Sequence, residues 1–175
     1  RSTLCHSGAT CEGGPGAVEC AQLLIQHAAD PDADLPAFLD SLALNWVILG
    51  TDAHAKNYAL CYTDIRPSLA PLYDVISVLP YPNVTYAPKA KLAMRIGGEY
   101  RASSIKRKHW IRFAEDLEVD HETVVDRVNA LVHDIPEAVE RVRAQVEGSG
   151  LDETFTALLL DTIEAQVPRR LRALE

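Results

Sequence analysis

A strongly apolar helical stretch that runs without a break into a polar loop most limits how this chain can fold. From Leu35 onward, apolar side chains recur at the i, i+3, i+4 and i+7 spacing of one helix face: Leu35, Phe38, Leu39, Leu42, Trp46 and Leu49. Ala43 and Val47 widen this stripe, so we expect the helix to be buried on more than one side. Pro36 suits the first turn of a helix that begins near Leu35.

The loop after this helix covers residues 50–57 and reads Gly-Thr-Asp-Ala-His-Ala-Lys-Asn. Residues 58–62 and 68–73 then predict two short strands, joined by a turn of hairpin length and therefore antiparallel. The second strand is expected to return Asp74 to the side of the loop. Polar side chains from two segments should therefore meet at the end of a buried helix.

The rest of the pattern is mainly helical, with one more strand. A helix is predicted over about 18–28, ended by Asp30-Pro31-Asp32, and alternating apolar residues predict a half-buried strand over 89–96. Further helical stripes cover residues 110–117, 124–132, 135–146 and 155–167, with Gly148 and Gly150 closing the third and Pro168 ending or kinking the last. The predicted fold is mainly α with a small β insert, in one domain spanning 1–175.

Composition agrees with one globular domain. The chain has 175 residues, of which 47% are hydrophobic and 24% charged, which excludes disordered and low-complexity classes. No apolar run approaches the roughly 18 residues of a membrane span, and no secretory signal is visible, so we expect no membrane contact and a cytoplasmic location. Four cysteines at Cys5, Cys11, Cys20 and Cys61 match no zinc spacing and predict free thiols. Because Arg1 is not Met, we expect a processed or excised piece of a longer protein.

Charge is unevenly distributed along the chain. The formal net charge is −8, yet residues 86–112 carry 8 Lys and Arg against 1 acid, whereas residues 113–175 carry 6 against 15. We call 86–112 the basic segment; its cations are Lys89, Lys91, Arg95, Arg101, Lys106, Arg107, Lys108 and Arg112. Two interpretations stay open: a solvated face that balances acidic neighbours, or a surface for an anionic partner.

Asp52 and Asn57 lie five residues apart on the polar loop, and Asp74 follows the hairpin. Phosphoryl transfer needs a carboxylate to orient or deprotonate the accepting hydroxyl, and oxygen ligands for Mg²⁺. The Asp-to-Asn interval of the protein-kinase catalytic loop is also five. Lys56 could offset charge on the transferred phosphate, and His54 could be a second acid/base. The alternatives are an Asx turn at a helix end, a solvated lysine, and a histidine that bonds backbone to shape the loop.

Several motifs occur in the order found in one known family. Residues 51–58 read Thr-Asp-Ala-His-Ala-Lys-Asn-Tyr, and residues 69–77 read Leu-Ala-Pro-Leu-Tyr-Asp-Val-Ile-Ser. Together with residues 92–100, the Trp110 helix and the glycines at 13–16, they resemble the C-terminal domain of the HipA-like toxin kinases. The chain thus resembles a kinase-like C-terminal lobe of the HipA type.

The resemblance implies a bacterial serine/threonine protein kinase from a type II toxin–antitoxin pair, using ATP and Mg²⁺. By that resemblance Asp52 would be the catalytic base, while Asn57 and Asp74 would hold the metal. It also implies a helix-turn-helix antitoxin of the HipB type as partner, operator DNA reached through that antitoxin, and an aminoacyl-tRNA synthetase as the kind of protein substrate.

One departure from the family is large. The phosphate loop and nucleotide-binding lysine are missing from this sequence, because Gly13-Gly14-Pro15-Gly16 lacks a following lysine. We therefore expect a C-lobe whose N-lobe is absent, which folds alone but does not transfer phosphate. Two alternatives remain: the lobe of a small-molecule or phosphoinositide-like kinase, and a fragment that binds an antitoxin or other partner without catalysis.

Overall fold

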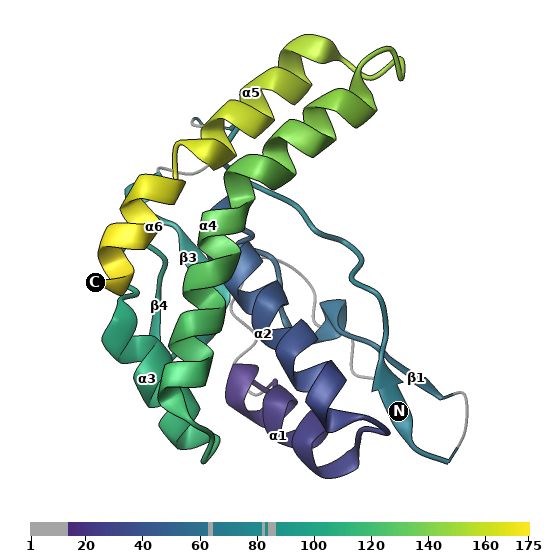
Figure 1. The fold of residues 1–175 in the computed structure, drawn as a ribbon, viewed down its shortest axis with the longest axis vertical. Coiled ribbons are helices and arrows are strands. Elements are labelled where there is room, and N and C mark those ends of the chain that lie inside the picture. The colour runs from purple at the N-terminus through teal and green to yellow at the C-terminus, as the bar shows by residue number, and fades with distance from the viewer. Residues whose placement is uncertain (1–13, 63–64, 82, 84–86) are drawn as a thin grey trace.

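The computed structural model describes residues 14–62, 65–81, 83 and 87–175 (Figure 1). Its helices are α1 (Ala17–His27), α2 (Pro31–Ile48), α3 (Arg107–Asp116), α4 (His121–Val146), α5 (Glu153–Glu164) and α6 (Val167–Leu174). Its strands are β1 (Leu60–Tyr62), β2 (Pro67–Leu69), β3 (Lys91–Ile96) and β4 (Glu99–Arg101). The fold is thus mainly α with small β inserts, as the sequence predicts.

Helix α2 is the centre of the core, and it packs against α1 on one side and α4 on another. Phe38, Trp46 and Val47 are fully buried, which confirms the expectation that this helix is covered on more than one side. The predicted start at Leu35 is wrong. Asp30 caps the helix by accepting a hydrogen bond from the Ala33 amide, Pro31 occupies the first turn, and Pro36 lies inside the helix.

The Val124–Val132 and Ile135–Val146 stripes belong to one helix, α4, and not to two as predicted. Pro136 lies inside this helix, where a proline disfavours helical geometry in the residue before it. Buried Val132, Ile135 and Val139 continue the same apolar face on both sides of Pro136, and packing of that face on α2 keeps the helix continuous. Figure 1 shows α5 lying back along the upper part of α4, and together they form the arm of the molecule.

Each sheet is a two-stranded antiparallel hairpin, β1 with β2 and β3 with β4. The β3 side chains alternate as predicted, with Leu92, Met94 and Ile96 buried. Strand β4 was not predicted, although the Gly97-Gly98 turn was a signal. A Cβ on Gly97, whose φ is +53°, would lie 2.1 Å from the His109 carbonyl oxygen, so the turn needs glycine there.

The C-terminal helix is fixed to the core by an arginine. Pro168 stands in the first turn of α6, so it begins a new helix after α5. From α6, Arg170 lies over the Trp46 ring, 4.8 Å from its centroid, and both side chains donate to the Ala102 carbonyl at 2.9 Å. Burial lowers the pKa of Arg170 to about 10.

Two sequence expectations concern membranes and thiols. None of the helices in the described ranges is both long and apolar enough to cross a membrane. Cys20 and Cys61 are free thiols, as predicted, whereas Cys5 and Cys11 lie outside the described residues. Of the glycines at 13–16, Gly14 and Gly16 are described, and Gly16 caps α1.

Candidate functional site

The polar loop begins where α2 ends in a tight turn. Leu49 adopts the left-handed conformation with φ of 54°, which is strained for a residue with a side chain, and it is almost fully buried. The Leu49 and Gly50 amides both donate to the Asn45 carbonyl, with the Gly50 bond at 2.8 Å. The chain therefore leaves the buried helix at a fixed point and in a fixed direction.

Residues 51–57 form a compact turn. The His54 amide donates to the Asp52 carbonyl at 2.8 Å, and the Asn57 amide donates to the His54 carbonyl at 2.9 Å. A single 3₁₀ turn, Ala55–Asn57, closes the loop. The Asp52 side chain is 65% exposed, so its carboxylate is open to a substrate from solvent.

Asn57 and Asp74 meet across 17 residues of sequence. Asn57 is only 6% exposed, and its Nδ2 donates to Asp74 Oδ2 at 2.6 Å. Asp74 has a φ of 55°, a left-handed conformation that aspartate tolerates better than most residues. The structure therefore brings this pair together, as the hairpin pattern predicted. Residues with a strained backbone, Leu49 and Asp74, lie on both sides of the loop.

The segment that carries Asp74 is fastened to the loop and to the end of α2. The Tyr73 hydroxyl donates to the Lys56 carbonyl at 2.6 Å, and the Ser77 hydroxyl donates to the Ile48 carbonyl at 2.5 Å. The predicted strand over 68–73 is in fact shorter, since β2 ends at Leu69 and residues 70–76 belong to no helix or strand. Side-chain bonds, and not sheet pairing, hold Asp74 in place.

A buried polar cluster lies beneath the loop. The Tyr58 hydroxyl is 3.3 Å from both Ser41 Oγ and Asn45 Nδ2, and Ser41 also donates to the Phe38 carbonyl at 2.6 Å. The Phe38 and Tyr58 rings pack edge to face at 4.9 Å between centroids. Burial raises the pKa of the Tyr58 hydroxyl, an effect that the Ser41 and Asn45 contacts reduce. Sequence reasoning missed Ser41 and Asn45, although a polar Asn inside an apolar run was a usable signal.

Asn57 and Asp74 have the donor types that suit a hard divalent cation. Asn57 Oδ1 is buried and has no hydrogen-bond partner among the described residues, which is unusual for a native amide. Asp74 contributes a carboxylate at the same place, and Mg²⁺ needs only a few protein oxygens at about 2.1 Å. In the structure Asn57 Nδ2 faces Asp74. A half-turn of the side-chain amide would put Oδ1 in its place, so that a metal ligand would replace a hydrogen-bond donor. These residues fit a magnesium ion.

His54 and Lys56 occupy different settings. The expectation that the His54 imidazole bonds backbone is wrong: its Nδ1 is buried without a partner in the described part of the chain, and its Nε2 is 4.0 Å from Asp52 Oδ1. The backbone of His54 shapes the loop instead. Lys56 is exposed on the 3₁₀ turn.

The cations of the basic segment are mostly exposed, but one is paired. Arg107 donates twice to the Glu122 carboxylate, at 2.7 and 2.8 Å, and so it contributes little free positive charge. The exposed members are Lys89, Lys91, Arg95, Arg101, Lys106, Lys108 and Arg112.

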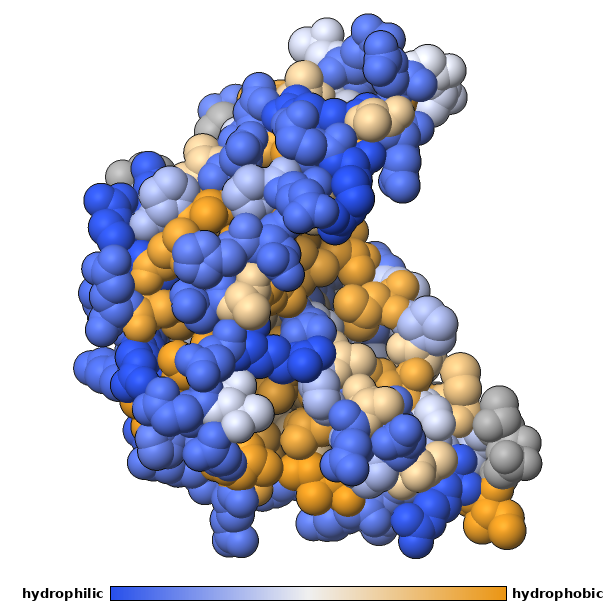
Figure 2. Space-filling view, in the orientation of Figure 1, coloured by the Kyte–Doolittle hydropathy of each residue, from blue (hydrophilic) through white to orange (hydrophobic). Residues whose placement is uncertain are grey.

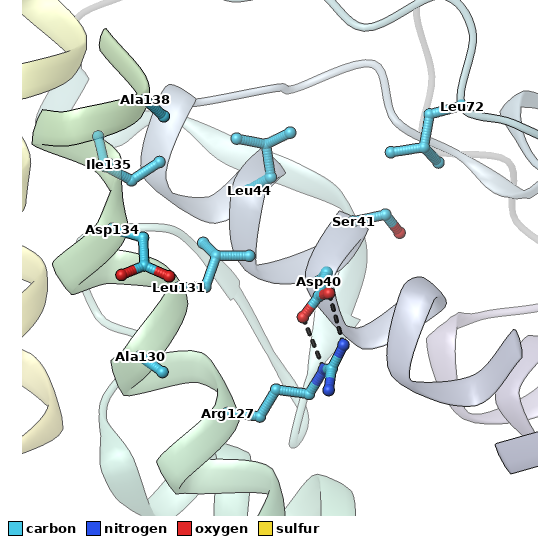
Figure 3. Close-up of a pocket in the computed structure, with 10 residues that line it drawn as sticks. All are labelled: Asp40, Ser41, Leu44, Leu72, Arg127, Ala130, Leu131, Asp134, Ile135 and Ala138. Atoms are coloured by element: carbon cyan, nitrogen blue, oxygen red, sulfur yellow. Dashed lines mark hydrogen bonds and ion pairs between the residues drawn. The ribbon is translucent and has the colours of Figure 1, made fainter. Parts of the chain in front are cut away.

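A separate groove of about 410 Å³ lies between α2 and α4, next to the segment that carries Asp74. Figure 3 shows Leu44 and Leu131 facing one another across it, Leu72 at one side, and the Arg127 guanidinium bonded to Asp40 at its end. Figure 2 shows hydrophobic surface in the hollow below the arm. The groove contains none of the predicted site residues.

Comparison with known proteins defines the class of domain. The profile of the HipA-like C-terminal domain matches residues 4–140, so the chain belongs to the HipA-like C-terminal domain family. A Sinorhizobium fredii protein named "Putative kinase Y4mE" is 37% identical over 131 residues, covering 75% of this chain and 30% of that protein. The "Serine/threonine-protein kinase toxin HipA" of Shewanella oneidensis is 27% identical over 119 residues, covering 68% of this chain and 27% of the toxin.

A solved structure has the same fold. It is the Shewanella oneidensis MR-1 toxin–antitoxin complex of HipA, HipB and operator DNA; its match has a TM-score of 0.78 and 24% identity, covering 91% of this chain and 37% of that one. The predicted family and fold class are thus confirmed. The chain spans less than a third of the length of the two named relatives.

Proposed function

We propose that this chain provides the acid/base and metal-binding half of an ATP-dependent serine/threonine protein kinase of the HipA type. The contact between Asn57 and Asp74, beside the loop that bears Asp52, is the observation that carries the proposal. It joins an amide and a carboxylate at one place, and these are the ligand types that phosphoryl transfer requires for its metal. Kinase names among the relatives support the same class of chemistry.

In this proposal Asp52 accepts the proton of the attacking hydroxyl. Its exposed carboxylate can reach a side chain of another protein, whereas a buried group could not. Asn57 and Asp74 hold Mg²⁺, which would neutralise charge on the nucleotide phosphates. Lys56 adds an exposed cation at the edge of the loop, and the His54 backbone keeps Asp52 and Asn57 in one turn.

The nucleotide is positioned by residues beyond this chain. No glycine-rich phosphate loop with a following lysine occurs in the 175 residues, and the relatives extend well beyond the matched part. Because positioning contributes a large share of such catalysis, we propose that the chain alone does not transfer phosphate. The whole kinase would act in the cytoplasm.

The partners follow from the relatives. We propose a HipB-like helix-turn-helix antitoxin as partner, since the Shewanella structure joins HipA to HipB and operator DNA. The exposed cations of the basic segment provide a surface for that DNA or for an acidic protein, although a net charge of −8 does not favour binding DNA alone. An aminoacyl-tRNA synthetase is the proposed kind of substrate.

The test follows labelled phosphate from [γ-³²P]ATP, using this chain and a longer protein of the length of its relatives. We expect label on protein serine or threonine with the longer protein and none with the chain alone. Label on a lipid or small molecule would favour the phosphoinositide-like or small-molecule alternative. Antitoxin binding without any transfer by the longer protein would contradict the kinase and favour a non-catalytic partner-binding role.

A further inference from the structure

Asn45 contacts both ends of the polar loop from inside α2. Its Nδ2 donates to the Tyr58 hydroxyl at 3.3 Å and to the Ser41 carbonyl at 2.9 Å. Its Oδ1 lies against Gly50, because a Cβ added to Gly50 would be only 2.1 Å from this oxygen. Gly50 opens the loop and Tyr58 closes it, so a single buried side chain touches both.

The burial of Asn45 indicates that its side-chain amide has a specific role. Asn45 is 7% exposed and Ser41 is fully buried, and a polar group at such depth is costly unless it is bonded. Asn45 Oδ1 has no donor within reach among the described residues, so the cost of burying it is not recovered by a hydrogen bond. A leucine, which has the same branched shape, would avoid that cost, and this favours a functional reason for the amide.

The route from Asn45 to the site is short. Tyr58 follows Asn57 directly, and its ring is held by Phe38 while its hydroxyl is held by Ser41 and Asn45. A shift of Tyr58 would therefore move the Asn57 amide, whose Nδ2 bonds Asp74 at 2.6 Å.

We propose that Asn45 is a positioning residue for the candidate phosphotransfer site: by holding Gly50 and Tyr58, it fixes the Asn57 amide against Asp74. This inference rests on the proposed function for its catalytic meaning, but the positioning itself can be measured without activity. Residues that support a metal ligand from behind typically change metal affinity about 10–100-fold when they are replaced.

The experiment observes the Asn57 side-chain amide by NMR in wild type, Asn45→Leu and Tyr58→Phe, first without metal and then with added Mn²⁺. We expect Asn45→Leu to move the Asn57 Nδ2 proton resonances toward those of a free amide. The Mn²⁺ concentration that gives half of the maximal broadening of these resonances should rise about tenfold or more, as expected for a residue that holds a metal ligand in place. Tyr58→Phe, which removes one hydroxyl and keeps the ring, should give a smaller change of the same sign.

Val128→Ala is the control, because it removes buried volume from α4 outside the loop and its supports. It should leave the Asn57 resonances and their Mn²⁺ dependence unchanged. Unchanged Asn57 resonances in both Asn45→Leu and Tyr58→Phe would overturn the proposal; if Asn45→Leu does not fold, Tyr58→Phe decides. The two variants could shift the Asn57 resonances while Mn²⁺ fails to broaden those resonances in wild type. That result would support the positioning role of Asn45 and contradict the metal role in the proposed function.

Discussion

The polar loop and the basic segment are both rich in charged and polar groups, yet they are built differently. The loop rests on buried groups: Asn57 is 6% exposed, Asn45 is 7% exposed, and bonds from Tyr73 and Ser77 fasten the segment that carries Asp74. The basic segment presents exposed cations on β3, β4 and α3, and Arg107 is already paired with Glu122.

This difference in construction suits the two regions to different roles. Preorganised groups in fixed positions can stabilise a transition state, whereas exposed cations act through the summed field and are screened by salt. Changes in the loop should therefore alter rate or local stability steeply. Changes in the basic segment should alter association gradually and in a salt-dependent way.

The largest expected effect is on phosphate transfer by the longer protein used in the labelled-ATP test. Asp52→Asn keeps the size of the side chain but removes the proton acceptor, and such losses cost about 10²–10⁴ in rate. Steady-state transfer from labelled ATP measures it. Asp126→Asn, at an exposed aspartate of α4, is the control and should change little. More than about a tenth of wild-type activity in Asp52→Asn would show that this carboxylate is not the general base.

The second effect is on stability at the start of the loop. In Gly50→Ala, the new Cβ would meet the buried Asn45 amide, and such overpacking costs about 1–3 kcal/mol in the free energy of unfolding. Denaturant unfolding measures the loss. In an Asn45→Ala background the added cost should fall to a small remainder, because only the Cβ of residue 45, 3.2 Å from the new atom, is left. Equal costs in the two backgrounds would mean that the two residues are not coupled.

The third effect separates paired from free cations in the basic segment. Lys106→Glu with Lys108→Glu should weaken the complex of kinase, antitoxin and operator DNA, with the salt slope reduced by up to about two units. Arg107→Gln with Glu122→Gln removes the ion pair without a change of net charge, so it should do less. Binding titrations over a range of salt concentrations measure both. An unchanged slope in the Lys106 and Lys108 variant would favour a solvated face that only balances acidic neighbours.

The smallest effect concerns pH and His109 at the start of α3. Burial, and then Lys108, lower the pKa of His109 below its ordinary 6.5, and its neutral Nδ1 accepts the Lys106 amide at 2.9 Å. The unfolded chain therefore takes up the proton first as pH falls. The His109 contribution to the free energy of unfolding should be complete above 6.5 and should be lost as pH falls toward the lower folded pKa.

His109→Gln should remove that part of the pH dependence, as measured by urea unfolding at pH 7.5 and at a series of lower values. His133→Gln, at an exposed position of α4, is the matched control. The same pH dependence in wild type and His109→Gln would show that the bond to Lys106 does not need a neutral imidazole.

Much of the fold could be predicted because it follows from periodicity. The α2 stripe, the alternation in β3 and the return of Asp74 to the loop are each set by local pattern and a short connection. A proline misled the prediction once: Pro36 was placed in the first turn of α2, but it lies inside the helix, which begins at Pro31. Pro136 likewise lies inside α4, and burial of the residues around these two prolines keeps both helices continuous.

The support beneath the site could not be predicted, because it depends on contacts between distant residues. Ser41 and Asn45 meet Tyr58 across 17 and 13 positions, and the spacing of polar residues does not reveal such a meeting. The Arg107–Glu122 pair is similar, since it exists only because α3 packs on α4. Residue types predicted the candidate chemistry, but only the packing shows what holds it in place.

If Asn57 and Asp74 form the metal-binding half of a phosphotransfer site, then a change of ligand at Asp74 should change the metal that the site prefers. Asp74→Cys replaces a hard oxygen ligand with a soft thiolate, which favours Cd²⁺ over Mg²⁺. In the longer protein, we expect this variant to lose phosphate transfer with Mg²⁺ by about 100-fold or more. Cd²⁺ should recover transfer in the variant, whereas it should not raise transfer by wild type. Transfer with Mg²⁺ that Asp74→Cys leaves unchanged would contradict the metal-binding role of Asp74.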